Sequence, residues 1–135
     1  MSGETDLKTL LGAMRPELQP ETYVFVTLPL DQSLPDGVPP LMVFGEKEGW
    51  TCIVNEEAAS RAGLSSTFPC RMITLSIHSS LTAVGFLAAV LPRLAAAGMG
   101  VNPVSGFYHD HLFVAADRAG DAMRILEEMA AANKG

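Results

Sequence analysis

The amino-acid sequence predicts an α+β protein built from two similar halves, each with an antiparallel sheet. Segments rich in β-branched and aromatic residues alternate along the chain with segments whose apolar residues recur at helical spacing. Both halves place a β-hairpin before a helix, as a diverged internal repeat would. A connector-like segment at residues 64–70 separates the halves, and we expect the boundary near Ser66. The expected domains are therefore residues 1–66 and 67–135.

The first half is predicted to run helix, strand, hairpin, helix. Its expected elements are a helix at residues 6–14, a strand at 22–28, a proline-rich loop at 29–40, a hairpin at 41–54 and a short helix ending before Gly63. Asp6 and Asn55 can cap the two helices with their side chains. Pro16 and Pro20 are expected to end the first helix.

The second half is predicted to run strand, helix, strand, strand, helix. Its expected elements are a strand at residues 71–77, a turn at 78–80, a helix at 81–97, two strands at 101–108 and 112–116, and a helix at 119–133. Pro92 falls inside the first of these helices and is expected to kink it. This order is that of a ferredoxin-like βαββαβ fold and lacks only a fourth strand.

Composition excludes several classes of partner. The 135 residues carry fifteen acidic and nine basic side chains, a net charge of -6, so the chain has no surplus of positive charge for a nucleic acid or an anionic membrane. The longest segment without Asp, Glu, Lys or Arg near the middle, residues 72–92, is interrupted by His78 and Ser80 and predicts a strand and a helix rather than a membrane span. The N-terminus does not read as a secretory signal, so we expect a cytoplasmic protein.

The two cysteines, Cys52 and Cys70, are expected to be buried thiols, since each lies alone among apolar strand residues. The glycine patterns of nucleotide-binding loops do not occur, nor does a nucleophile elbow, and we expect no cofactor and no catalytic site. Trp50 can line a pocket, although an aromatic side chain packed on its cross-strand neighbours is the commoner arrangement.

Residues 73–114 carry a recognisable pattern. A strand enters a loop, a glycine lies in the first turn of a helix, an alanine-rich stretch ends in an Ala-Gly pair, and an Asn follows. Here these are residues 73–77, the loop 78–84, Gly85, Ala97-Gly98 and Asn102. This segment resembles the ACT domain, the small regulatory module of amino-acid metabolism, and most closely the second ACT domain of aspartate kinases. The loop has Thr82, Ala83 and Val84 where an Asp and a Pro are usual.

Most of the chain also resembles a family of short tandem ACT proteins, whose shared segments correspond here to residues 23–25, 46–51, 78–85 and 108–114. The resemblance implies two ferredoxin-like halves that bind a small ligand, such as an amino acid, for regulation. It implies a ligand site formed by His78, Ser79, Ser80, Leu81, Thr82, Ala83, Val84, Gly85 and Asn102.

The chemistry of the loop is compatible with that site. A helix N-terminus offers unpaired N–H groups and a partial positive charge, which suit a carboxylate. Gly85 would allow close approach of a ligand or a facing backbone. The alternative is that Ser79 and Ser80 only cap the helix and that Gly85 only eases its packing on the sheet.

Three further candidates lie together at residues 109–111. His109, Asp110 and His111 are good metal ligands by chemistry, but nothing else in the sequence completes a ligand set, so we expect a polar hairpin tip without metal. We conclude from the sequence that the protein is a non-catalytic small-ligand sensor and a homodimer, because the edge strands of small sheets are often covered by pairing. A structural dimerisation module without a ligand and a small enzyme or metal protein are the alternatives.

Overall fold

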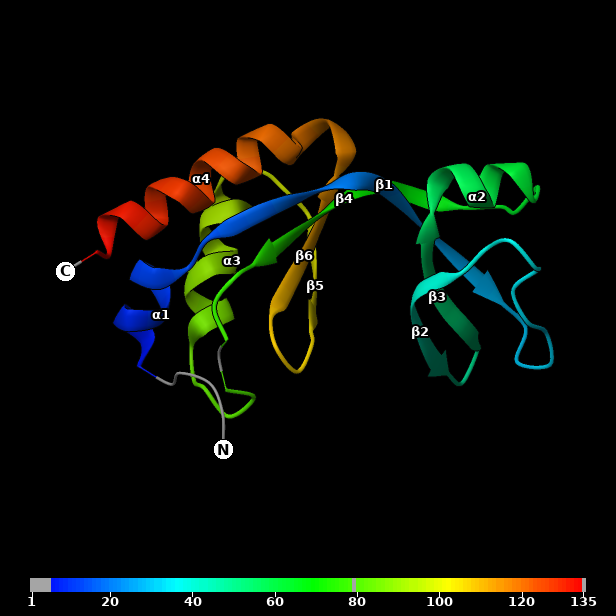
Figure 1. Cartoon of the computed structure of the whole chain (residues 1–135), viewed down its shortest axis with the longest axis horizontal. Coiled ribbons are helices and arrows are strands. Elements are labelled where there is room, and N and C mark those ends of the chain that lie inside the picture. Colours follow the sequence, from blue (N-terminus) through cyan, green and yellow to red (C-terminus); the bar gives the residue numbers. More distant parts are fainter. Residues whose placement is uncertain (1–5, 79, 135) are drawn as a thin grey trace. The chain divides into compact units, whose positions relative to one another are not determined.

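The computed structural model describes residues 6–78 and 80–134 of the chain (Figure 1). Its elements are α1 (Leu7–Ala13), β1 (Pro16–Leu28), β2 (Pro40–Glu46), β3 (Gly49–Asn55), α2 (Glu56–Arg61), β4 (Thr67–Leu75), α3 (Phe86–Ala96), β5 (Val101–Ser105), β6 (Asp110–Ala115), a 3₁₀ turn (Ala116–Arg118) and α4 (Ala119–Ala132). In the part of the chain that is described, no helix is long and apolar enough to cross a membrane.

The chain forms two compact units, and strands β1 and β4 each contribute to both. Unit 1 comprises Met1–Gln19 and Arg71–Gly135, and unit 2 comprises Pro20–Cys70. The hydrogen-bonded strand order is β2-β3-β1-β4-β6-β5, so β1 and β4 each begin in one unit and end in the other. The α+β prediction is confirmed.

Unit 1 is a complete ferredoxin-like fold because the N-terminal end of β1 supplies the strand that the second half lacks. Its strand order is β1-β4-β6-β5, with α3 connecting β4 to β5 and α4 following β6 at the end of the chain. Unit 2 has the equivalent order β2-β3-β1-β4, completed by the N-terminal end of β4. The compact units are therefore not divided at Ser66, and domains at residues 1–66 and 67–135 remain a prediction about the sequence repeat.

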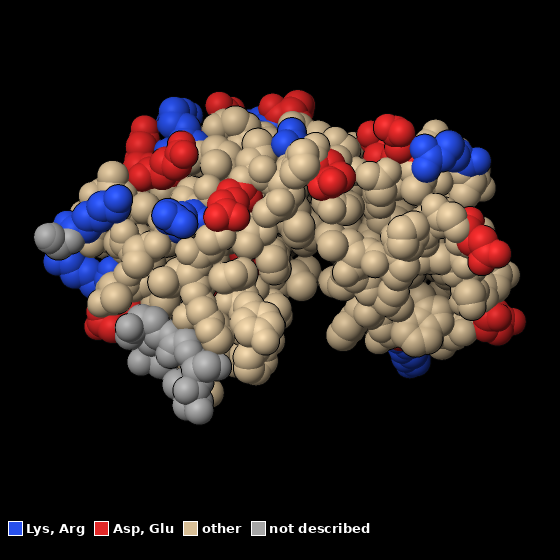
Figure 2. All heavy atoms as spheres, in the orientation of Figure 1, with Lys and Arg blue, Asp and Glu red and all other residues tan. Residues whose placement is uncertain are grey.

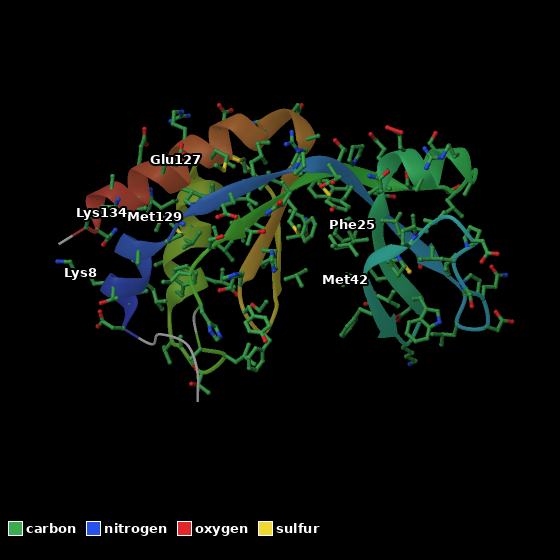
Figure 3. All side chains as sticks on the ribbon, in the orientation of Figure 1. Lys8, Phe25, Met42, Glu127, Met129 and Lys134 are labelled. Carbon is green, nitrogen blue, oxygen red and sulfur yellow. The ribbon has the colours of Figure 1, made fainter. Side chains whose placement is uncertain are left out.

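Helices α1, α3 and α4 enclose the core of unit 1. Ile73 and Leu75 of β4 lie in this core with Leu126 of α4, and all three are fully buried. The apolar face of α4 follows from its sequence, since buried positions recur at helical spacing. Figure 3 shows Glu127 and Met129 on different sides of α4, with Met129 inside. On the face drawn in Figure 2, basic and acidic side chains are intermingled over α4.

Unit 2 lacks one of the two helices of a ferredoxin-like half. Residues 29–39, a proline-rich loop, connect β1 to β2 where the other half has a helix. Leu34 and Val38 of this loop pack on the same core as Ala58 and Ala59 of α2. The loop thus covers part of the sheet face that a helix would cover.

Strands β1 and β4 are longer than the sequence predicts. β1 begins at Pro16, where we expected only the end of a helix, and residues 67–70, expected to be a connector, belong to β4. The register of β1 with β3 runs from Tyr23 to Leu28, so Pro16 and Pro20 have β4 on one side only. Proline is tolerated in an edge strand where its missing N–H faces the unpaired side.

The helix expected at residues 81–97 begins five residues later, at Phe86. The expected start at residue 81 is therefore wrong. Residues 81–82 form a turn, and Gly85 adopts φ +89°, which is outside the helical region. Pro92 lies inside the helix as expected.

Candidate functional site

A pocket of about 190 Å³ lies in unit 1 where α3 begins. The loop after β4, the first turn of α3 and the β5–β6 turn form its wall. The lining residues are Ser80, Leu81, Ala83, Gly85, Phe86, Leu87, Ala88, Ser105, Gly106 and Asp110. Three segments distant in sequence meet here, which is typical of a ligand site.

The loop is shaped by hydrogen bonds within it. The Ser80 hydroxyl accepts a bond from the Thr82 N–H at 3.1 Å and lies 2.8 Å from the Thr82 hydroxyl. The Ala83 N–H donates to the Ser80 carbonyl at 2.9 Å. This is the turn that Ser and Thr hydroxyls favour. Ser80 therefore stabilises the turn and does not cap α3, which the sequence left as an alternative.

Gly85 is the N-cap of α3 and contributes no side chain. Its φ of +89° and ψ of -1° are left-handed, a conformation that glycine adopts without steric cost. As a glycine, it makes no side-chain capping hydrogen bond to the helix. The first N–H groups of α3, those of Phe86, Leu87 and Ala88, belong to residues that line the pocket. The positive end of the helix dipole thus faces the pocket.

Asp110 brings a carboxylate into the same pocket. Its side chain is only 8% exposed and accepts a hydrogen bond of 2.6 Å from the Ser105 hydroxyl. Ser105 and Asp110 are directly opposed in the register of β5 with β6, so the hairpin fixes their separation. The pocket therefore combines a buried acceptor with the donor groups of a helix N-terminus.

An exposed aromatic cluster is formed by the loop and the β5–β6 turn. The His78 ring lies 5.9 Å from that of Phe107 and 5.5 Å from that of Tyr108, and the last two rings are 5.1 Å apart edge to face. Phe107 and Tyr108 are 58% and 66% exposed. Leu81 and Val84 are also exposed. We call these four exposed side chains the aromatic-apolar patch.

The structure brings together part of the predicted site. Ser80, Leu81, Ala83 and Gly85 line the pocket, whereas Thr82 and Val84 are loop residues outside its lining. His78 lies against the aromatic rings, and Asn102 is exposed at the other end of β5 from Ser105. Ser79 lies outside the described residues.

Asp110 and Ser105 are pocket residues that sequence reasoning did not assign to the site. Asp110 was considered only as a metal ligand at a hairpin tip. The signal available in the sequence was the four-residue connection between them, since a hairpin loop of that length places its flanking residues opposite each other. The approach of this hairpin to the loop after β4 depends on strand order, which the sequence pattern does not contain.

The rings of His109 and His111 do not converge on one point. Their rings are 6.4 Å apart and nearly perpendicular, and Nδ1 of His111 lies 3.0 Å from the Thr74 hydroxyl. Among residues 6–78 and 80–134, no group of three or more His, Cys, Asp and Glu side chains is arranged to hold a metal ion.

Both cysteines are buried thiols, as predicted. The Cys70 thiol donates to the Tyr23 carbonyl at 3.4 Å, and burial, followed by the charge of Glu56, raises its pKa to about 11. Burial also raises the pKa of Cys52. Neither thiol has the lowered pKa of a reactive cysteine.

Family models match both repeats. Two models of the ACT domain match the sequence in tandem, at residues 2–71 and 67–128. Comparison with curated protein sequences gives no match.

Solved structures agree with these matches. A protein of unknown function from Vibrio cholerae, described as a possible transport protein, is 40% identical, with a TM-score of 0.82 over 92% of this chain and 95% of that one. A protein from Agrobacterium tumefaciens shows the same fold at 16% identity, TM-score 0.73, over 87% and 89% of the two chains. The ligand-free regulatory subunit of aspartate kinase from Thermus thermophilus does so at 11% identity, TM-score 0.62, over 88% and 97%. The chain therefore belongs to the ACT-domain family.

Proposed function

We propose that this protein is a non-catalytic sensor that binds a free amino acid in the pocket at the start of α3. ACT domains generally bind small ligands for regulation. The observation that carries the amino-acid proposal is the buried Asp110 carboxylate in the same small pocket as the N-terminus of α3, whose cap residue, Gly85, has no side chain.

The two charges of an α-amino acid match these two groups. The ligand carboxylate accepts hydrogen bonds from the N–H groups of Phe86, Leu87 and Ala88, where the helix dipole favours a negative charge. The ligand ammonium group faces Asp110, whose position is held by Ser105. A pocket of about 190 Å³ has the size for a small molecule.

Binding would act by stabilising one arrangement of the protein. A ligand shifts a conformational equilibrium only by its difference in affinity for the two states. The loop at residues 80–85 joins the pocket to the aromatic-apolar patch, since Leu81 belongs to both. Closure of this loop over a ligand would change the patch that a partner contacts.

The aromatic-apolar patch supports a homodimer. Four large apolar side chains are exposed on this small unit, and two of them, Phe107 and Tyr108, are in ring contact, which is typical of an interaction surface. We propose that a second copy of the chain covers this patch and that the protein works in the cytoplasm. The same patch favours the second candidate function, an interaction module that binds no small ligand.

A thermal-shift screen against the standard L-amino acids tests the proposal. A ligand at about 100 times its dissociation constant adds about 2.7 kcal/mol to the free energy of unfolding. For the amino acid that stabilises most, the analogue without the ammonium group and the amide without the carboxylate should each lose the shift, because each keeps only one of the two charges.

The matched variant is Asp110→Asn, which keeps the size and the hydrogen bond to Ser105 but removes the charge. It should abolish stabilisation by the amino acid and leave unliganded chain folded. If no amino acid stabilises the wild-type chain, or if Asp110→Asn responds equally, the pocket is not an amino-acid site and the interaction module is the better account.

A further inference from the structure

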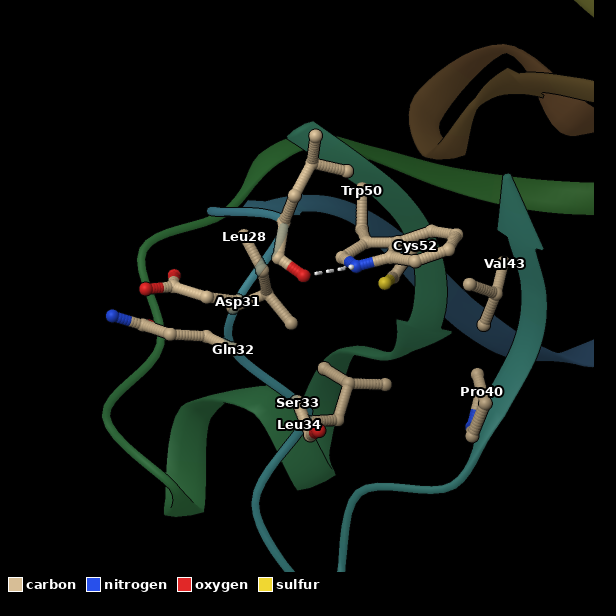
Figure 4. A pocket seen from close by; sticks show the side chains of 10 residues that line it. Leu28, Asp31, Gln32, Ser33, Leu34, Pro40, Val43, Trp50 and Cys52 are labelled. Atoms are coloured by element: carbon tan, nitrogen blue, oxygen red, sulfur yellow. Dashed lines mark hydrogen bonds between the residues drawn. The ribbon is translucent and has the colours of Figure 1, made fainter. Parts of the chain in front are cut away.

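A second cavity, of about 430 Å³, lies in unit 2 between the proline-rich loop and the sheet (Figure 4). Leu28, Val43, Trp50 and Cys52 form its floor, and these residues stand on one face of three neighbouring strands: Cys52 is paired with Val43, and Trp50 with Leu28. Residues 30–34 form its roof. The cavity occupies the sheet face that the missing helix of this half would cover.

Residues 30–34, which form the roof of the cavity, are held in place by contacts within the protein. The Trp50 indole N–H donates to the Leu30 carbonyl at 3.1 Å and ties the start of the loop to β3. Val38, 3% exposed, and Leu34 anchor the end of the loop in the core. Turns closed by the Gln32 and Val38 N–H groups stiffen the segment between. A preorganised cavity loses little entropy when it binds a ligand.

The Trp50 ring is held as one wall of the cavity. Gly45 is paired with Trp50 across β2 and β3, and a Cβ at Gly45 would lie 2.8 Å from Cζ3 of the indole. Only glycine leaves the space that the ring occupies. Because the indole N–H is already bonded to Leu30, the ring offers a ligand its apolar face rather than a donor.

The surface that the described residues present to the cavity carries no charged side chain. The one ionisable carboxylate of the lining, Asp31, and the neighbouring Gln32 point away from the cavity in Figure 4. Leu34, Pro40 and Val43 face inward. A charged ligand group would lose its hydration here without gaining a partner.

We infer that this cavity binds a neutral, ring-containing small molecule that stacks on Trp50, at a site separate from the amino-acid pocket of unit 1. The floor and roof supply apolar contacts and the indole supplies a flat aromatic wall. This inference does not depend on the proposed amino-acid site, because all lining residues belong to unit 2.

Trp50 is the only tryptophan of the chain and lines this cavity, so its fluorescence reports a probe bound there. The probe is 1-anilinonaphthalene, compared with its 8-sulfonate, which carries the same rings and one negative charge. We expect saturable quenching of Trp50 by the neutral probe at a stoichiometry of one, and binding of the sulfonate weaker by at least about tenfold, because the charge would be buried unpaired.

A matched pair of variants on β2 locates the binding. Val43→Phe places a ring in the cavity and should lower the affinity for the neutral probe by at least about tenfold. Leu41→Phe adds the same ring at a similarly exposed position outside the lining and should leave binding unchanged; both variants should retain the circular dichroism of the wild type. Absence of saturable quenching, equal affinity for the sulfonate, or equal loss in both variants would overturn the inference. Asp110→Asn should not change the affinity for the neutral probe. A negative result for this cavity is therefore distinguishable from a negative result for the amino-acid pocket.

Discussion

The hydroxyl of Thr74 on β4 lies 3.0 Å from Nδ1 of His111 on β6. The Gln19 side-chain amide donates to the same hydroxyl at 3.1 Å, which leaves the Thr74 hydrogen available to Nδ1 when the histidine carries its proton on Nε2. Nδ1 then accepts, as it does in a neutral imidazole. Three neighbouring strands of unit 1, including the N-terminal end of β1, are joined by this row of polar side chains.

The first prediction concerns pH. Burial, followed by the charge of His109, lowers the pKa of His111, while Asp110 raises it. The unfolded chain therefore takes up a proton before the folded chain does as the pH falls. The stability that neutral His111 contributes is fully present above its unfolded pKa, about 6.5, and declines as the pH falls toward the folded value.

Urea unfolding between about pH 8 and pH 5 measures this decline, and His111→Gln should make the stability curve flatter below about pH 6.5. An unchanged slope in His111→Gln would show that other groups cause the acid dependence.

Gly85→Val is predicted to destabilise through backbone strain. A φ of +89° costs a β-branched residue about 1–3 kcal/mol. The nearest atom to a new Cβ is Cδ2 of Leu7 at 3.8 Å, so steric crowding is not the cause. Gly85→Asn should cost less, because Asn tolerates left-handed conformations. Denaturant unfolding compares the variants, and equal stability of all three chains would contradict this account.

The aromatic-apolar patch is predicted to hold the dimer. Light scattering on the eluting protein should give the mass of two chains for the wild type and of one chain for Phe107→Ser/Tyr108→Ser, since exposed aromatic side chains contribute strongly to interfaces. Phe44→Ser is the control, because Phe44 is a similarly exposed ring, at 62%, in unit 2. A monomeric wild type, or a dimer that persists in the double variant, would exclude the patch as the interface.

Local chemistry made much of the fold predictable. Asp6 and Asn55 accept hydrogen bonds from the N–H groups of Thr9 and Ala58, as their positions before apolar periodic segments indicated. The hairpin β2–β3 and helix α4 also follow the predicted ranges closely. These features depend on residues that are close in sequence.

The exchange of strands between the units was not predictable in this way. Residues 16–19 pair with β4, more than fifty residues away, and Pro16 gave a local signal against a strand. Separation along the sequence also explains why the predicted ligand site lacked some of the pocket residues. The resemblance indicated the loop and Gly85, but Asp110 becomes a pocket residue only through the order of β4, β6 and β5.

Nuclear magnetic resonance of isotope-labelled protein tests the amino-acid site most directly. During titration with the L-amino acid that stabilises the chain most, the amide resonances of Phe86, Leu87, Ala88 and Gly106 should shift most, because these residues line the pocket at the start of α3. Asp110→Asn should abolish the shifts. Shifts confined to other residues, such as those around Trp50, or no saturable shift with any amino acid, would contradict the proposal that this pocket senses an amino acid.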